Sequence, residues 1–186
     1  MTTTIRQLTM AEREAGLEEI QRSPANDGRL EMIVRRPSTG VREELAEGEL
    51  DPAAGLVGDT WSKRGSRRTT DGSAHPDMQI NVMNARAAAL VAQHRSRWAL
   101  AGDQLFVDLD LSEANLPAGT RLAIGSAVIE ITAEPHTACG KFADRFGAEA
   151  AAFVNATRHR DLHLRGVNAR VVQPGTIRAG DRVTKS

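Results

Sequence analysis

Short runs of alternating apolar residues, each bounded by glycine or proline, recur along this chain and constrain its fold more than any other feature. In RLEMIVRRP, the apolar residues Leu30, Met32 and Val34 fall on alternate positions before Pro37 ends the run. Alternation with a period of two is typical of a β-strand that buries one face. The chain is therefore predicted to be rich in short strands.

Other segments carry the same signal. Further strands are predicted over Val41–Leu45, Met78–Asn84, Leu105–Leu109, Arg121–Ile124, Ala127–Thr132, Leu162–Leu164, Val167–Val172 and Asp181–Thr184. The stretch 55–61, GLVGDTW, is bounded by glycine and is read as a turn.

Three segments are predicted to be helical. Thr9 and Glu12 form a capping-box pattern at the start of a helix that runs to Gln21. Asn84 is placed to cap a second helix, Ala85–His94. A third is expected within Gly140–Asn155, where its apolar residues lie on one helical face and Gly147 is a possible break into two helices.

These elements predict a mainly β protein with helices (α+β), in which a closed or partly closed β-barrel is decorated by two or three helices. Strands and helices do not alternate as βαβ units, and the GxGxxG and P-loop motifs of nucleotide-binding folds are absent. Residues 1–28 are predicted to form a helical N-terminal extension, and residues 29–186 the barrel domain.

Charge and composition limit the functional classes. The 186 residues hold 24 basic and 24 acidic side chains, a net charge of +0, which argues against nucleic acid or a membrane surface as partner. The chain shows no apolar run long enough to span a bilayer and no secretory signal. Its single cysteine fits a reducing compartment, so a cytoplasmic location is expected.

That cysteine, Cys139 in PHTACGK, is the candidate reactive residue. Thr137 is predicted to cap the following helix and to place Cys139 in its first turn, where free N–H groups favour a thiolate. Lys141 and Arg145 would add positive charge, and His136 lies three residues upstream. The thiolate would act as a sulfur carrier, a nucleophile or a metal ligand; the alternative is a small buried hydrophobic residue.

A zinc site is a separate interpretation. His136-x2-Cys139 is followed, after nineteen residues, by His159-x3-His163, which loosely resembles two pairs of zinc ligands. The first pair has one cysteine, the gap is longer than in a zinc finger, and a helix fills it.

Two basic segments could bind an anion. The polar segment Ser62–Asp77 and the segment Thr157–Gly166 are both rich in arginine, which grips phosphate through paired hydrogen bonds. The basic residues of interest are Lys63, Arg64, Arg67, Arg68, Arg158, Arg160 and Arg165. For either segment alone, a solvated surface is the alternative.

Three aspartates each follow a glycine. Asp103 and Asp181 are expected to be structural residues of tight turns. Asp59 precedes the long polar segment, and its role stays open at this stage.

Several stretches, taken together and in order, resemble a known family. They are GLVGD (55–59), MQINVMN (78–84), LPAGTRLAIGSAVIEIT (116–132), PHTACGKFADRFG (135–147) and LRGVNARVVQPGTIRAGDRV (164–183). Over roughly Arg29 to Val183 the chain resembles the MOSC domain family, named for the C-terminal domain of molybdenum cofactor sulfurase.

The resemblance implies a β-barrel whose cysteine, matched by Cys139, carries sulfur or coordinates molybdenum, while basic residues hold the pterin phosphate of a molybdenum cofactor (molybdopterin). Some relatives act on N-hydroxylated bases. The implied cofactor-binding residues are His136, Lys141, Arg145, Arg64, Arg67, Arg68, Arg158, Arg165 and Asn168. The chain shows no cysteine-desulfurase domain and hence no pyridoxal-phosphate lysine, so a separate sulfur donor such as a cysteine desulfurase is the implied partner. The alternative is a non-catalytic module that binds a small molecule or cofactor, with Cys139 structural.

Overall fold

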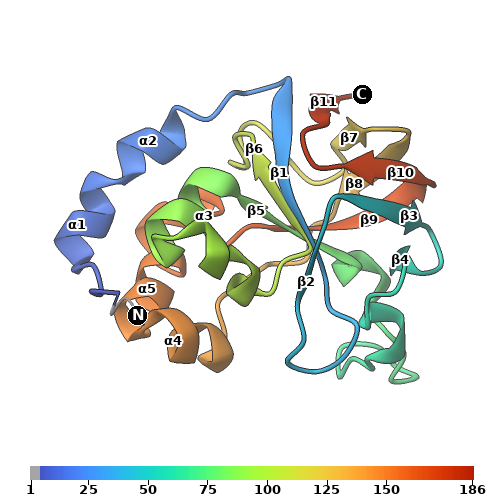
Figure 1. Ribbon diagram of the computed structural model, residues 1–186, viewed down its shortest axis with the longest axis horizontal. Coiled ribbons are helices and arrows are strands. Elements are labelled where there is room, and N and C mark those ends of the chain that lie inside the picture. The colour runs from blue at the N-terminus through green and yellow to red at the C-terminus, as the bar shows by residue number, and fades with distance from the viewer. Residues whose placement is uncertain (1–4) are drawn as a thin grey trace.

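The centre of the protein is a sheet whose two ends meet. The computed structural model describes residues 5–186. Eight strands lie in the order β11-β7-β8-β9-β5-β6-β1-β2, and the pairing of β11 with β1 closes seven of them into a barrel (Figure 1). Neighbouring strands are antiparallel except β5 and β6, which are parallel. The predicted α+β class, a β-barrel decorated by helices, is confirmed.

The seven barrel strands are β1 (Gly28–Arg35), β5 (Ile80–Asn84), β6 (Leu105–Asp108), β7 (Arg121–Ile124), β8 (Ala127–Ile131), β9 (Val167–Gln173) and β11 (Arg182–Lys185), and β2 (Glu43–Leu45) pairs with β1 outside the closed ring. A smaller sheet holds β10 (Gly175–Arg178), β3 (Glu47–Asp51) and β4 (Gly55–Leu56). The α-helices are α1 (Met10–Ala15), α2 (Leu17–Gln21), α3 (Ala85–Ala92), α4 (Gly140–Phe146) and α5 (Ala148–Val154). The sequence signal missed β3, β4 and β10, because β4 has only two residues and lies in the stretch read as a turn, while β3 and β10 each bury a single large apolar side chain, Leu50 and Ile177.

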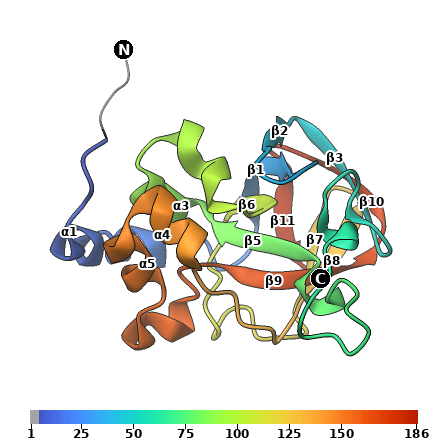
Figure 2. The ribbon, with the colours of Figure 1, turned by 90° about the horizontal axis from the view of Figure 1, so that it is seen from below.

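Two apolar cores result, one inside the barrel and one beneath the helices. The helices gather on one side of the barrel, and the small sheet lies on the other (Figures 1 and 2). A bulge in β1 between Leu30 and Met32 divides the strand between the two cores. Leu30 and Ile33 lie in the interior of the barrel, whereas Met32 and Val34 pack under the helices. The prediction that Leu30, Met32 and Val34 share one buried face was therefore wrong.

The predicted helices are present in the structure, but each is shorter than predicted or divided in two. The Thr9–Glu12 capping box is present, although Gly16 divides the predicted helix into α1 and α2. The third helix divides at Gly147, whose φ of 94° and ψ of 154° are not helical. The strand predicted at Leu162–Leu164 was wrong: Thr157–Leu162 is a 3₁₀ helix that ends at His163 in the left-handed conformation.

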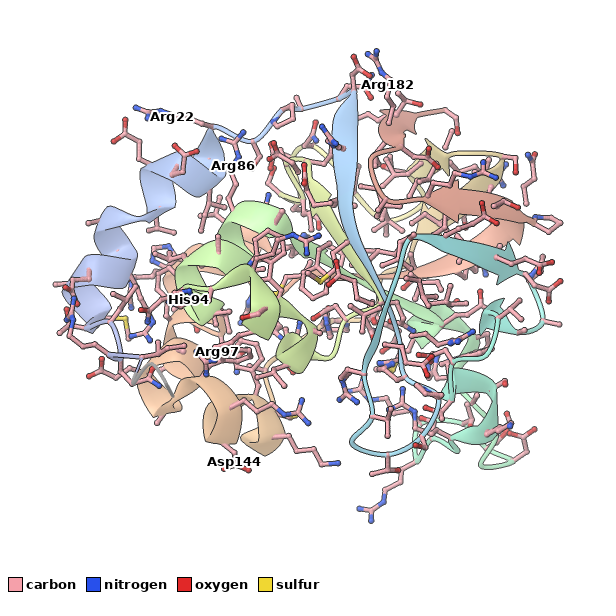
Figure 3. The ribbon with its side chains drawn as sticks, viewed as in Figure 1. Arg22, Arg86, His94, Arg97, Asp144 and Arg182 are labelled. Carbon is pink, nitrogen blue, oxygen red and sulfur yellow. The ribbon has the colours of Figure 1, made fainter. Side chains whose placement is uncertain are left out.

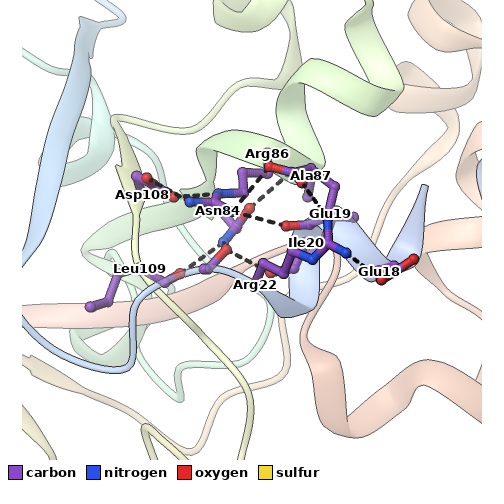
Figure 4. Close-up of polar contacts among 10 residues, drawn as sticks. Glu18, Glu19, Ile20, Arg22, Asn84, Arg86, Ala87, Asp108 and Leu109 are labelled. Atoms are coloured by element: carbon purple, nitrogen blue, oxygen red, sulfur yellow. Dashed lines mark hydrogen bonds and ion pairs between the residues drawn. The ribbon is translucent and has the colours of Figure 1, made fainter.

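Asn84 joins the N-terminal helices to the barrel (Figure 4). Its Oδ1 accepts a hydrogen bond from the N–H of Ala87 at 2.9 Å, as predicted for a helix cap. Its Nδ2 donates to Ser23 Oγ and to the carbonyl oxygen of Leu109, each at 2.8 Å. Arg86 adds ion pairs to Asp108 and Glu19.

Charged side chains lie at the outer surface of the helical layer, such as Arg22 at the C-terminal end of α2 and Asp144 on α4 (Figure 3). Among residues 5–186, no helix is long and apolar enough to cross a membrane.

Candidate functional site

A strap of irregular backbone, residues 133–138, carries the chain from β8 to the cysteine. Asn168 on β9 donates through Nδ2 to the carbonyl oxygens of Glu134 and Pro135, at 3.0 and 3.3 Å. Asn155, after α5, hydrogen-bonds both the N–H and the C=O of Ala138. Because both ends of the strap are held by side-chain amides, the position of Cys139 is fixed without regular sheet pairing.

Cys139 is itself the N-cap residue of α4, so the prediction that Thr137 caps this helix was wrong. The side chain is exposed, which also overturns the interpretation of Cys139 as buried packing. Partial burial raises the pKa of the thiol, but the backbone N–H groups of Phe142 and Lys141 and the charge of Arg165 lower it further. The pKa of Cys139 therefore lies below its ordinary value, which favours the nucleophilic thiolate.

Beside the cysteine lies a buried charged cluster. His136 Nε2 is 2.8 Å from Asp103 Oδ1, and Arg165 Nη1 donates to Asp103 Oδ2 at 2.6 Å. The guanidinium of Arg165 also lies 4.9 Å from the ring centroid of Phe142. Burial raises the pKa of Asp103, but the charges of Arg165 and His136 outweigh it and hold that pKa below its usual range. Burial and Arg165 lower the pKa of His136, so its imidazole is neutral near pH 7.

Cys139 and the cluster open into one cleft of about 680 Å³, a volume typical of sites for small molecules and cofactors. The cleft lies between α4, the loop from β1 to β2 and the segment after β4. The cationic residues that line it are Arg36, Arg42, Arg64, Lys141, Arg145 and Arg165. Residues from distant parts of the sequence thus meet around one thiol.

The cations of the cleft differ in their pairing. The charge of Arg36 is compensated within the protein, since its guanidinium donates to both carboxylate oxygens of Asp59 at 2.8 Å and also to the carbonyl oxygen of Gly102. Asp59, whose role was open, is thus a buried structural partner. Four other cationic residues of the cleft form no ion pair with any carboxylate among residues 5–186. They are Arg42, Arg64, Lys141 and Arg145.

The mutual proximity of these cations has an electrostatic cost. Burial and repulsion from Arg145, Arg36 and Arg64 lower the pKa of Arg42. The Nε of Arg42 is buried and has no hydrogen-bond partner within the described chain. Uncompensated positive charge of this kind is relieved when an anion binds.

The candidate residues from the sequence are distributed unevenly. His136, Lys141, Arg145, Arg64 and Arg165 line the cleft with Cys139. Asn168 lies beneath the strap, Arg68 pairs with Glu134 at 2.8 Å, Arg158 pairs with Glu14, and Arg67 is exposed on its loop outside the cleft lining. The two basic segments therefore contribute one arginine each, Arg64 and Arg165, to the same cleft.

Sequence reasoning missed Arg36 and Arg42. Arg36 continues the alternation of Met32 and Val34, so the period of the strand carried a signal that this arginine is buried. Arg42 lies in a loop, and its sequence context held no comparable signal.

The residues of the suggested zinc pattern are engaged elsewhere. His159 Nε2 lies 2.8 Å from Glu14 Oε2, and His163 Nδ1 lies 2.7 Å from the carbonyl oxygen of Leu111. Over residues 5–186, no group of three or more His, Cys, Asp or Glu side chains is placed to hold a metal ion.

The protein thus combines a closed seven-stranded barrel with one exposed thiol at the edge of a cationic cleft. The MOSC domain family model matches residues 69–184, and the chain belongs to that family. No curated protein sequence matches it. Among solved structures it is similar to the YuaD protein of Bacillus subtilis, with 17% identity, a TM-score of 0.58 and coverage of 84% of this chain and 93% of that one.

Two further structures show the same fold. YiiM from Escherichia coli has 18% identity and a TM-score of 0.52 over 85% of this chain and 69% of that chain. YiiM from Geobacillus stearothermophilus has 14% identity and a TM-score of 0.58 over 86% and 75%. At these identities the likeness concerns the fold alone.

Proposed function

We propose that the cleft binds a phosphate-bearing molybdenum cofactor, with Cys139 as the sulfur ligand of the metal. The observation that carries this proposal is that Cys139 and four cations without carboxylate partners open into the same cleft. A thiol that served only as a carrier would need no such group of cations. A phosphate, in contrast, needs several donors of positive charge.

The residues of the cleft fit such a group. The orphaned Nε of Arg42 and the nearby guanidinium and ammonium groups, which have no carboxylate partner, suit a dianionic phosphate. A thiolate is a soft ligand that suits a heavy transition metal, and a lowered pKa makes it available at neutral pH. When bound, the molybdenum centre would supply two-electron redox chemistry.

The chain's own residues would then bind the cofactor and orient it in the cleft. Arg42 and Arg145 would hold the phosphate, and Lys141 would neutralise charge close to the thiolate. His136, fixed by Asp103, would present a neutral imidazole to the cleft wall. A neutral imidazole can accept a proton from a bound ligand.

A second candidate is sulfur carriage, which the exposure of Cys139 favours. The Cys139 thiolate would attack the terminal sulfur of a persulfide on a donor such as a cysteine desulfurase. A new sulfur–sulfur bond would form on Cys139, the bond between the two donor sulfurs would break, and the donor would leave as a thiolate.

Native mass spectrometry of the full chain, purified without reductant, tests both candidates. Cofactor binding predicts a bound mass that contains molybdenum and a pterin phosphate, absent in Cys139→Ser and in Arg42→Ala/Arg145→Ala. Sulfur carriage predicts one added sulfur atom on Cys139, which the double arginine variant retains. Arg67→Ala, which removes an exposed arginine outside the cleft lining, serves as the control.

The cofactor proposal fails if wild-type protein offered molybdopterin binds none, or if Cys139→Ser binds it equally well. Sulfur carriage fails if incubation with a persulfide donor leaves Cys139 unmodified.

A further inference from the structure

A second cavity, of about 490 Å³, lies along the strap next to the Cys139 cleft. Its buried apolar residues are Leu116, Ile131, Val154, Leu164 and Val167, and the buried Arg165 also lines it. The two cavities share His136, Thr137 and Arg165, while Cys139 lines only the cleft. A deep aliphatic floor of this size is typical of a site for a small organic molecule rather than for an inorganic ion.

The rim of this cavity carries one uncompensated charge. Among residues 5–186, the guanidinium of Arg160 forms no hydrogen bond or ion pair, and its side chain is exposed at the cavity. The other charged groups of the lining have partners. Glu134 pairs with Arg68, Arg165 pairs with Asp103, and Glu113 lies 3.4 Å from His163.

His163 gives the rim a second polar group of fixed orientation. Its Nδ1 lies 2.7 Å from the carbonyl oxygen of Leu111, and since a carbonyl can only accept, Nδ1 carries the proton. Its backbone, with φ of 49°, is in the left-handed conformation that ends the preceding 3₁₀ helix. The fold thus holds this imidazole at the cavity wall.

We propose that this cavity is a second ligand site, which binds an organic monoanion with an apolar body. The apolar body lies on the aliphatic floor, and the carboxylate or similar head group pairs with Arg160 at the rim. A polyanion is disfavoured because only one cation is free. An organic cation is disfavoured because Glu134, the less exposed carboxylate of the lining, already pairs with Arg68, and because the unpaired arginine at the rim is itself positive.

This site does not depend on the cofactor proposal, because Cys139 and the unpaired cations of the cleft are not in its lining. A ligand here would lie against the strap that holds Cys139. The two sites therefore predict different competitors: inorganic phosphate for the cleft, and an aliphatic carboxylate for the cavity.

Isothermal titration calorimetry on the full chain provides the test, with octanoate as the probe. We expect one octanoate per chain, and binding of 1-octanol, which has the tail without the charge, about tenfold weaker or less. Arg160→Glu should weaken octanoate binding by about tenfold or more. Ala118→Trp, at an exposed turn on the rim, should fill the cavity and abolish it.

Two controls separate this site from other surfaces. Arg67→Glu reverses an exposed charge that is not part of either lining, and Cys139→Ser removes the thiol; both should leave octanoate binding unchanged. The proposal is overturned if octanoate does not bind, if its binding survives both Arg160→Glu and Ala118→Trp, or if inorganic phosphate displaces it. Circular dichroism checks that each variant is folded. If Ala118→Trp does not fold, the result for Arg160→Glu alone decides whether the proposal stands.

Discussion

Asn155 hydrogen-bonds the backbone of Ala138 through both the oxygen and the nitrogen of its side-chain amide. Its Oδ1 accepts from the N–H of Ala138 at 2.8 Å, and its Nδ2 donates to the carbonyl oxygen of the same residue at 3.0 Å. The next residue is Cys139, whose pKa is lowered by the N–H groups at the start of α4. The orientation of the thiol toward those N–H groups therefore depends on a side chain that follows α5.

Removal of the two hydrogen bonds between Asn155 and Ala138 should change the reactivity of the Cys139 thiol more than the stability of the fold. In Asn155→Ala the pKa of Cys139 should rise toward the ordinary thiol value of about 8.5, and alkylation by iodoacetamide at pH 7 should slow. The free energy of unfolding should fall by about 1 kcal/mol. An unchanged pH profile of alkylation in Asn155→Ala would refute the positioning role.

The cations of the cleft should make the protein responsive to phosphate. At low ionic strength, inorganic phosphate should raise the Tm, because a ligand that binds only the folded state stabilises it. Arg42→Met should raise the Tm of the ligand-free protein, since it relieves repulsion from Arg145, Arg36 and Arg64, and should also reduce the response to phosphate. Differential scanning calorimetry measures both effects; equal phosphate responses in wild type and Arg42→Met would contradict the prediction.

His136 should make stability depend on pH below about 6.5. Its folded-state pKa is lowered by burial and by Arg165, so the unfolded state binds more protons as the pH falls below the unfolded value of about 6.5. The free energy of unfolding should therefore decrease with falling pH, by at most about 1.4 kcal/mol per pH unit from this group. The pKa of Asp103 is also lowered, but its own loss begins only below about pH 3.9.

Urea titrations of wild type and His136→Gln between pH 5 and 7.5 isolate the histidine. The variant should be less stable at neutral pH and show a shallower dependence on pH in this window. A slope identical to that of wild type would mean that His136 is protonated in the folded state.

The buried ion pair of Arg36 with Asp59 should contribute far more to stability than the partly exposed pair that its neighbour Arg35 forms. The side chain of Asp59 has 0% exposure, so Asp59→Asn leaves Arg36 buried without its counter-charge. Such a loss costs about 3–5 kcal/mol. Arg35 and Glu43 form the matched control, since their pair is 35% and 41% exposed. Glu43→Gln should cost at most about 1 kcal/mol in the same chemical unfolding experiment.

Two glycines of the cysteine region should respond oppositely to alanine. Gly147 has φ of 94°, and an added Cβ would lie 3.1 Å from Gln7 Oε1, so Gly147→Ala should destabilise by about 1–3 kcal/mol. Gly140, in the first turn of α4, has no atom within 4 Å of an added Cβ. Gly140→Ala should stabilise by about 0.5–1 kcal/mol. Thermal unfolding that shows the same sign for both would contradict this account.

The fold class and most elements follow from the sequence because their causes are local. Residues Arg121–Ile124 form β7 as the alternation predicts, and Asn84 caps α3 as its place before an alanine-rich run predicts. The split at Gly147 follows from glycine's weak helix propensity. The strand at Leu162–Leu164 failed because the alternation there is brief, and the left-handed turn at His163 is set by contacts with Leu111 and Gly166.

The cleft could not be read from local signals. Arg42, Arg64, Arg145 and Arg165 are far apart in the sequence, and only the closure of the barrel and the packing of α4 bring them around Cys139. Arg67 and Arg68 share a segment with Arg64, yet neither is in the cleft lining, because the direction of each side chain depends on how that loop folds. The sequence by itself determined the barrel, its helices and the thiol. Tertiary structure decided which charges face that thiol, because electrostatic interaction depends on distance in space and not on distance along the chain.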